Sequence, residues 1–88
     1  MIGYVYILRA ADDRLYVGST SNLEYRMRQH IAGHTQTTRN MKKFALVFKQ
    51  ETANLKIARA AERKLKKLKR KDYLEKIIKD GYIKILPP

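Results

Sequence analysis

Two short, mostly apolar segments lie near the N-terminus. Residues 3–9 (GYVYILR) and 15–20 (LYVGST) are rich in β-branched and aromatic side chains, which favour strands. The residues between them (AADDR) have the composition of a tight turn, so the two strands are expected to form an antiparallel hairpin. Residues 44–50 (FALVFKQ) have the same character and predict a third strand.

The apolar spacing changes to that of a helix after residue 20. Ser21 is expected to cap this helix, and Glu24, three residues later, to complete a capping box. The helix is expected to continue to about Ala32 and to stop at Gly33. Its core-facing apolar positions would be Leu23, Met27 and Ile31.

Two further helices are predicted in the second half of the chain. A long one spans about Asn54–Lys69, where Asn54 is an N-cap residue, and a shorter one spans about Asp72–Lys79 and ends at Gly81. Residues 82–86 (YIKIL) fit either a short edge strand or an ordered tail. The order β-β-α-β-α-α predicts a single α/β domain over residues 1–88, with helices flanking a small, three-stranded and largely antiparallel sheet. Two connections are not hairpins, so the strand order stays open.

The length of the hairpin turn decides which tyrosines share a face of the sheet. A three-residue turn would pair Tyr6 with Gly18 and Leu8 with Tyr16, and both tyrosines would then lie on one face. A two-residue turn would place them on opposite faces. Gly18 opposite Tyr6 would leave room for the phenol ring, which favours the three-residue turn. The alternative role for each tyrosine is that of a core aromatic residue with its hydroxyl at the rim.

Charged side chains border the apolar faces of two of the predicted helices. Arg26 and His30 are one helical turn apart and can reach the same point, so a shared anion or a neutral His30 would explain the pair. Alternatively, Arg26 only covers apolar surface with its stem. Glu62 is the only carboxylate in residues 55–71, a strongly basic stretch. It fits a surface pair with Lys66 or a ligand for a hard divalent cation that bridges to phosphate.

Composition excludes several classes of protein. The chain of 88 residues is 44% hydrophobic, which suits one modest core and argues against a disordered basic tail. It has no cysteine, so disulfides, thiolate metal sites and cysteine nucleophiles are excluded. No apolar run approaches the roughly 18 residues of a membrane span, and no signal-peptide pattern is present. We expect a cytoplasmic protein without a membrane partner.

The charge balance indicates a polyanionic partner. Twenty Lys and Arg against eight Asp and Glu give a net charge of +12, and nucleic acid is the commonest polyanion. Phosphate contacts of this kind are sensitive to salt and mostly independent of sequence. The residues expected to make them are Arg39, Lys42, Lys43, Lys66, Lys67 and Lys69.

These residues, in this order, resemble the GIY-YIG nuclease family, which is named for two strand motifs. The motifs stand here as Tyr-Val-Tyr at residues 4–6 and Tyr-Val-Gly at residues 16–18. The segment NLEYRMRQH is similar to the family's Arg-x-x-x-His/Tyr element, at Arg26 and His30. The segment ARAAERKLKKLKR is similar to the helix that carries the family's metal-binding glutamate, at Glu62.

The resemblance covers about residues 3–70 and is greatest to the small single-domain members of bacteria and archaea. It implies a metal-dependent endonuclease that hydrolyses phosphodiester bonds in nucleic acid, with DNA favoured over RNA and repair or recombination suggested by analogy. One small domain without an appended module further implies weak sequence specificity, or a protein partner that supplies it.

The resemblance also implies roles for five residues. Glu62 would hold one Mg²⁺ or Mn²⁺ as its only protein ligand, and Arg26 would contact phosphate oxygens. Tyr6 or Tyr16 would act as the base, with its pKa lowered by Arg26 and the metal. His30 would position or relay, although its ordinary pKa near 6.5 also suits a base.

The chain departs from the family pattern in two places. The first motif is Tyr-Val-Tyr instead of Gly-Ile-Tyr, and no asparagine follows Glu62. The missing asparagine favours an alternative, a non-catalytic nucleic-acid-binding protein that retains the nuclease fold. A third possibility is a basic protein associated with RNA or the ribosome. A nuclease predicts that the tyrosines, Arg26, His30 and Glu62 line one cleft, whereas binding alone requires no carboxylate facing a polyanion.

Overall fold

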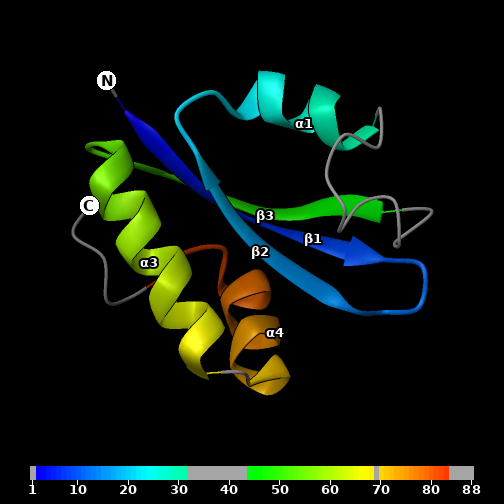
Figure 1. Cartoon of the computed structure of the whole chain (residues 1–88). Coiled ribbons are helices and arrows are strands. Elements are labelled where there is room, and N and C mark those ends of the chain that lie inside the picture. Colours follow the sequence, from blue (N-terminus) through cyan, green and yellow to red (C-terminus); the bar gives the residue numbers. More distant parts are fainter. Residues whose placement is uncertain (1, 32–43, 69, 84–88) are drawn as a thin grey trace.

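A three-stranded antiparallel sheet forms the centre of the computed structural model, with β1 (Gly3–Ala10) between β2 (Leu15–Thr20) and β3 (Phe44–Thr52) (Figure 1). The structure describes residues 2–31, 44–68 and 70–83. The element order β-β-α-β-α-α and the antiparallel sheet confirm the predicted fold class. The strand order β2-β1-β3, which the sequence left open, makes β1 the central strand.

The hairpin has the three-residue turn that the sequence favoured. Tyr6 pairs with Gly18 and Leu8 with Tyr16, so both tyrosines lie on the same face of the sheet. The turn closes with the backbone N–H of Ala10 donating to the carbonyl of Arg14 at 2.8 Å. Asp13 adopts a left-handed conformation with φ of 72°, which is typical of the last position of a three-residue hairpin turn.

Helices cover both faces of the sheet, so the central strand is buried on both sides (Figure 1). Helix α1 (Leu23–Ile31) lies on one face, and α3 (Leu55–Leu68) and α4 (Lys71–Asp80) lie on the other. On the α3 face, the buried cluster includes Val5, Ile7, Val17, Phe48, Ala58, Ala61 and Leu65. On the α1 face, Tyr6, Leu8 and Ala10 pack with Tyr16, Leu23, Met27 and Phe44.

The caps of two helices are asparagines. The predicted Ser21 cap is wrong, because α1 begins at Leu23 and the side-chain oxygen of Asn22 accepts the backbone N–H of Tyr25 at 3.0 Å. Glu24 pairs with Arg28 at 2.6 Å, so no capping box forms. At the start of α3, Asn54 is the cap as predicted and accepts the N–H of Ile57 at 2.9 Å.

The core-facing stripe of α1 differs from the prediction at its C-terminal end. Ile31 is 77% exposed, whereas His30 is 1% exposed. Seven residues make nearly two full helical turns, so His30 stands almost above Leu23, while Ile31 is rotated about 100° further. Ala32 and Gly33, the predicted end of this helix, lie outside the described residues.

Helix α4 is tied to the hairpin by a group of ion pairs. Arg9 on β1 forms two hydrogen bonds with Glu75 of α4, one of them 3.0 Å long. Arg9 also pairs with Asp13, and Asp13 pairs with Lys71 at 2.8 Å. The helix ends at Gly81, whose φ of 81° and N–H bond to the carbonyl of Ile77 confirm the predicted stop.

The chain after α4 returns to the sheet. The buried Ile83 donates its backbone N–H to the side-chain oxygen of Gln50 on β3 at 2.6 Å. Residues 84–86, the remainder of the predicted strand or tail, lie outside the described residues. The helices of the described part, α1, α3 and α4, are too short or too polar to cross a lipid bilayer.

Candidate active site

Tyr6, at the centre of β1, is the hub of a buried polar group beneath α1. Its hydroxyl lies 2.9 Å from Nε2 of His30, and it accepts a hydrogen bond from Nε of Arg26 at 3.3 Å. Arg26 and His30 lie on adjacent turns of α1, so one face of the helix supplies both partners of Tyr6. Tyr6 is fully buried, and no buried side-chain polar atom of the described residues lacks a partner.

Gly18 creates the space that Tyr6 occupies. A Cβ built on Gly18 would lie 2.3 Å from both Cζ and the hydroxyl of Tyr6. No other residue fits at this position without moving the phenol ring. The glycine of the second strand motif therefore has a packing reason, and the ring of Tyr6 crosses over the edge strand β2 because of it.

His30 is enclosed by three aromatic rings. The ring centres of Tyr6, Tyr16 and Phe44 lie 5.7, 5.9 and 5.9 Å from that of His30, each in an edge-to-face arrangement. Burial lowers the pKa of His30 below its ordinary value, and the charge of Arg26 lowers it further. The imidazole is therefore neutral at pH 7, as one of the two sequence interpretations required.

Burial also determines the protonation of Tyr6. It raises the pKa of the phenol above its ordinary value near 10, and the hydrogen bond and charge of Arg26 offset only part of that rise. Arg26 thus lowers the pKa of Tyr6 as expected, but the expected net lowering is wrong for Tyr6 in the protein alone, because burial raises the pKa by more. The pKa of Arg26 is raised, mainly by its hydrogen bond with Tyr6 and to a smaller extent by Tyr16, so the guanidinium stays protonated.

Glu62 contacts β2 from the opposite face of the sheet. It lies on α3, where Ser19 of β2 donates a hydrogen bond to one carboxylate oxygen and Lys66 pairs with the other at 2.7 Å. The side chain of Glu62 is 21% exposed. The predicted Glu62–Lys66 pair is thus present, and it belongs to a larger group, because the ammonium of Lys66 lies 5.2 Å from the ring centre of Tyr16.

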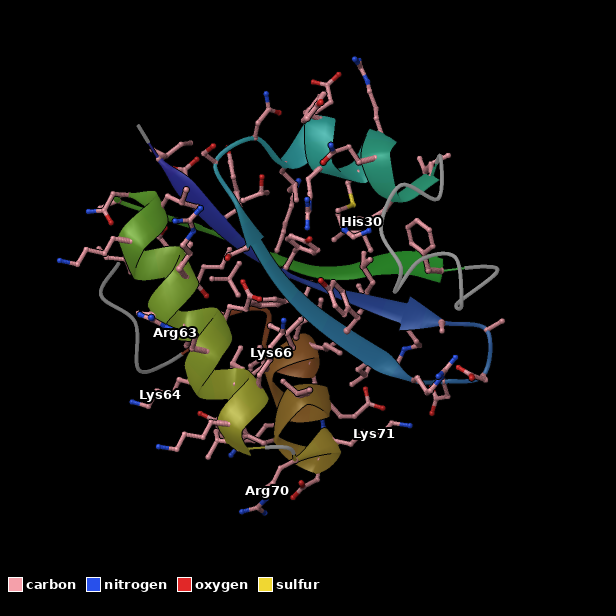
Figure 2. The ribbon with its side chains drawn as sticks, in the orientation of Figure 1. His30, Arg63, Lys64, Lys66, Arg70 and Lys71 are labelled. Carbon is pink, nitrogen blue, oxygen red and sulfur yellow. The ribbon has the colours of Figure 1, made fainter. Side chains whose placement is uncertain are left out.

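The group around Tyr6 and the group around Glu62 lie on opposite faces of the edge strand β2. Tyr16 and Gly18 face α1, whereas Val17 and Ser19 face α3, as the alternation of a strand requires. Figure 2 shows His30 between α1 and the sheet and Lys66 on the α3 side of β2. The structure therefore brings all five predicted site residues around one short stretch of β2, with Tyr16 and Lys66 in contact between the two sides.

A divalent cation fits this site through one protein ligand. The described residues contain no group of three or more His, Cys, Asp or Glu side chains that could hold a metal. Glu62 is a hard oxygen ligand with partial exposure, which suits Mg²⁺ or Mn²⁺ if water and phosphate oxygens complete the shell. The donor set therefore suits an ion that is bound together with its substrate.

The predicted phosphate contacts are only partly described. Lys66 is turned towards Glu62 and Tyr16, and Lys67 is exposed on α3. Four others, Arg39, Lys42, Lys43 and Lys69, lie outside the described residues.

Ser19 is a site residue that sequence reasoning missed. It follows the second strand motif directly, and its hydroxyl holds Glu62, 43 positions away. The signal was the alternation of β2, which turns Ser19 away from Tyr16 and towards whatever covers the opposite face. Recognising it required knowing that α3 packs on that face.

Comparisons with known proteins agree with the sequence motifs. A model of the GIY-YIG catalytic domain matches residues 2–77. The chain is similar to a UPF0213 protein of Oceanobacillus iheyensis, with 37% identity over 75 residues that cover 84% of this chain and 87% of the relative. It is also similar to the UPF0213 protein YhbQ of Escherichia coli, with 30% identity over 81 residues that cover 91% and 80% of the two chains.

A solved structure has the same architecture. The solution NMR structure of a UPF0213 protein from Bacillus halodurans superimposes with a TM-score of 0.58. The two chains are 29% identical, and the match covers 92% of this chain and 87% of the other. The sheet and helices described above are therefore shared with a protein of known structure.

Proposed function

The chain belongs to the GIY-YIG family, and from that premise we propose that it is an endonuclease that hydrolyses phosphodiester bonds in nucleic acid with the help of one divalent metal ion. The observation that carries the proposal is the meeting of two groups at β2. Arginine and tyrosine side chains lie on one side of this strand, and a carboxylate paired with a lysine lies on the other. A protein that only binds a polyanion gains nothing from a carboxylate in this place.

We propose that Tyr16 activates the attacking water, because Tyr16 is partly exposed whereas Tyr6 is fully buried. The Tyr16 oxygen takes the proton of the water while its own proton passes to solvent. The bond from the water oxygen to phosphorus forms as the ester bond breaks, and the leaving oxygen takes a proton from solvent.

Arg26 suits the phosphate, because its guanidinium can offer forked donors to two oxygens. Tyr6 and His30 would then be positioning residues. The Tyr6 hydroxyl accepts from Nε of Arg26 and is itself held by His30, so the pair fixes the direction of the guanidinium.

Glu62 would hold Mg²⁺ or Mn²⁺, which supplies stabilisation of negative charge on the phosphate and on the leaving oxygen when bound. Ser19 fixes one of the carboxylate oxygens, and Lys66 leaves the other when a phosphate competes for its ammonium. The family resemblance favours DNA as the nucleic acid. Its affinity should fall steeply as salt rises, because phosphate contacts dominate the binding.

The test is a panel of labelled single-stranded, double-stranded, nicked and branched DNAs and RNAs. Each would be incubated with Mg²⁺, Mn²⁺ or EDTA and with wild type or the Glu62→Gln variant. We expect cleavage with either metal, none with EDTA, and a loss of about 100-fold or more in the variant. Binding of the panel by both proteins without cleavage by either would overturn the proposal and establish the non-catalytic alternative.

A further inference from the structure

A groove runs beside the candidate active site, between the β1–β2 hairpin and the junction of α3 and α4. Its volume is about 450 Å³, which is within the range of small-molecule and cofactor sites. The floor is apolar and is formed by side chains from three elements, Leu15 and Val17 of β2, Leu65 of α3 and Leu74 of α4. A floor of this kind favours a flat, weakly hydrated group.

Cations surround the floor. Arg14, Lys66, Arg70 and Lys71 line the groove, against a single acid, Asp12. Figure 2 shows Lys66 between α3 and β2, Lys71 on the hairpin side of α4 and Arg70 at the junction of α3 and α4, whereas Arg63 and Lys64 point away from the sheet. The rim therefore complements an anion, and the floor complements an apolar ring.

Each of these cations has an acidic partner in the protein alone. Arg14 pairs with Asp12 at 2.6 Å, and Arg70 pairs with Asp72 at 2.7 Å. The side chains of Arg14 and Arg70 are 63% and 65% exposed. Ion pairs as exposed as these are weak, so a phosphate can take over the cations at little cost.

The groove is continuous with the candidate active site through two residues. Tyr16 and Lys66 line the groove, and the same two side chains link the two sides of β2. A strand whose phosphate lies between Arg26 and Glu62 would therefore have its neighbouring nucleotide at the mouth of the groove.

We infer that this groove is a nucleotide subsite. It binds the nucleotide next to the scissile phosphate, with the base on the floor of Leu15, Leu65 and Leu74 and the adjoining phosphate on Arg70 and Lys71. Bases bind between aromatic or apolar side chains, and a basic track beside such a surface holds the backbone. The inference rests on the proposed function for the position of the scissile phosphate.

The experiment uses the full chain in EDTA, where cleavage does not interfere, and the probe is the thymidine trinucleotide with a 5′-phosphate. Leucine methyl groups would be labelled and followed by NMR during titration. We expect the signals of Leu15, Leu65 and Leu74 to shift, because a bound base ring lies against them. Leu46 on β3 and Leu55 at the start of α3 do not line the groove and are the internal controls.

Two double variants test the rim. Arg70→Gln/Lys71→Gln should weaken binding of the trinucleotide by about 10-fold or more at low salt. Lys76→Gln/Lys79→Gln removes the same charge from exposed positions of α4 that do not line this groove, and should change affinity less than threefold. Equal losses in the two variants would mean general electrostatic attraction and would overturn the subsite.

The outcomes separate this inference from the proposed function. If the methyl signals and the rim variant behave as expected but no nucleic acid is cut with metal, the subsite stands and the endonuclease assignment fails. If wild type cuts but the three methyl signals do not move, the base does not bind on the floor and the subsite is wrong.

Discussion

The ring of Tyr6 fills the position that a side chain on residue 18 would need: a Cβ on Gly18 would lie 2.3 Å from the Tyr6 hydroxyl. Gly18→Ala must therefore push the phenol out of its place against Arg26 and His30. We expect a loss of about 1–3 kcal/mol in the free energy of unfolding, as is typical of overpacked cores, together with loss of cleavage. Urea unfolding measures the first effect.

Tyr6→Leu in the same chain is the control, since a shorter side chain removes the steric conflict. The double variant Gly18→Ala/Tyr6→Leu should lose less stability than the sum of the two single variants. Strict additivity would mean that the two residues do not compete for this space.

The buried His30 predicts that stability falls in mild acid. Its pKa is lower in the folded protein than in the unfolded chain, so the unfolded chain binds more protons as the pH falls below about 6.5. The contribution of the neutral imidazole is complete above that pH and is lost as the pH falls through the folded pKa. Urea unfolding at several pH values from 8 to 5 should show the decline in wild type and a flatter profile in His30→Gln. His34 is present in both proteins and cancels in the comparison. Parallel profiles would contradict a neutral, buried His30.

The two tyrosines are expected to differ in their effect on cleavage. Tyr16→Phe removes the hydroxyl that we assign to the attacking water and should lower kcat by about 100-fold or more. Tyr6→Phe removes the acceptor of Arg26 and should raise the KM for nucleic acid as well as lower kcat, because phosphate contact is disturbed. Single-turnover cleavage with saturating protein separates the two effects. A larger loss of kcat in Tyr6→Phe would reverse the assignment.

Lys66 is expected to oppose metal binding in the absence of nucleic acid. Its ammonium pairs with the oxygen of Glu62 that an ion would use, and it repels a divalent cation at short range. Lys66→Met should therefore bind Mn²⁺ roughly threefold or more tightly, as measured by the EPR signal of the free ion. Lys67→Met loses the same charge at the next position of α3 and should change the affinity little. Equal gains in both variants would show that only net charge matters.

The start of α1 gives a prediction about stability alone. Asn22→Ala removes the acceptor of the Tyr25 N–H and should cost about 1 kcal/mol in the free energy of unfolding. Ser21→Ala, at the position that the sequence pattern favoured, should cost less than about 0.5 kcal/mol. Thermal or urea unfolding of the two variants is sufficient, and a larger loss for Ser21→Ala would contradict the observed cap.

The sequence was informative where one residue type had a single physical reason to be present. Gly18 favoured the three-residue hairpin turn, because that turn places it opposite Tyr6 and gives the phenol its space, and the structure has this register. The caps of α1 could not be separated in the same way, since Ser21 and Asn22 are adjacent and both residue types are good caps. The structure decides for Asn22, because α1 begins at Leu23.

Burial of His30 could not be predicted from hydrophobicity. Histidine is usually counted as polar, so the helical spacing predicts Ile31 as the last core-facing residue of α1. His30 belongs to the core because a buried tyrosine hydroxyl and three aromatic rings surround it, and this depends on how α1 crosses the sheet. The groove was beyond sequence reasoning for a similar reason, because it forms where α4 packs against the hairpin. The domain extent of 1–88 and the catalytic roles stay predictions.

The predicted site residues come from two separate segments of the chain, which are joined when β1 pairs with both β2 and β3. Residues 2–31 contain the tyrosines, Arg26 and His30, whereas Glu62 arrives only with the segment that follows β3. The hairpin is a local contact and forms early, but pairing of β1 with β3 joins distant parts of the chain and is slower. During refolding, the onset of cleavage would therefore report the arrival of β3 and α3, later than any optical signal from the hairpin. A newly made chain would therefore acquire its chemistry only after α3 has packed on the sheet.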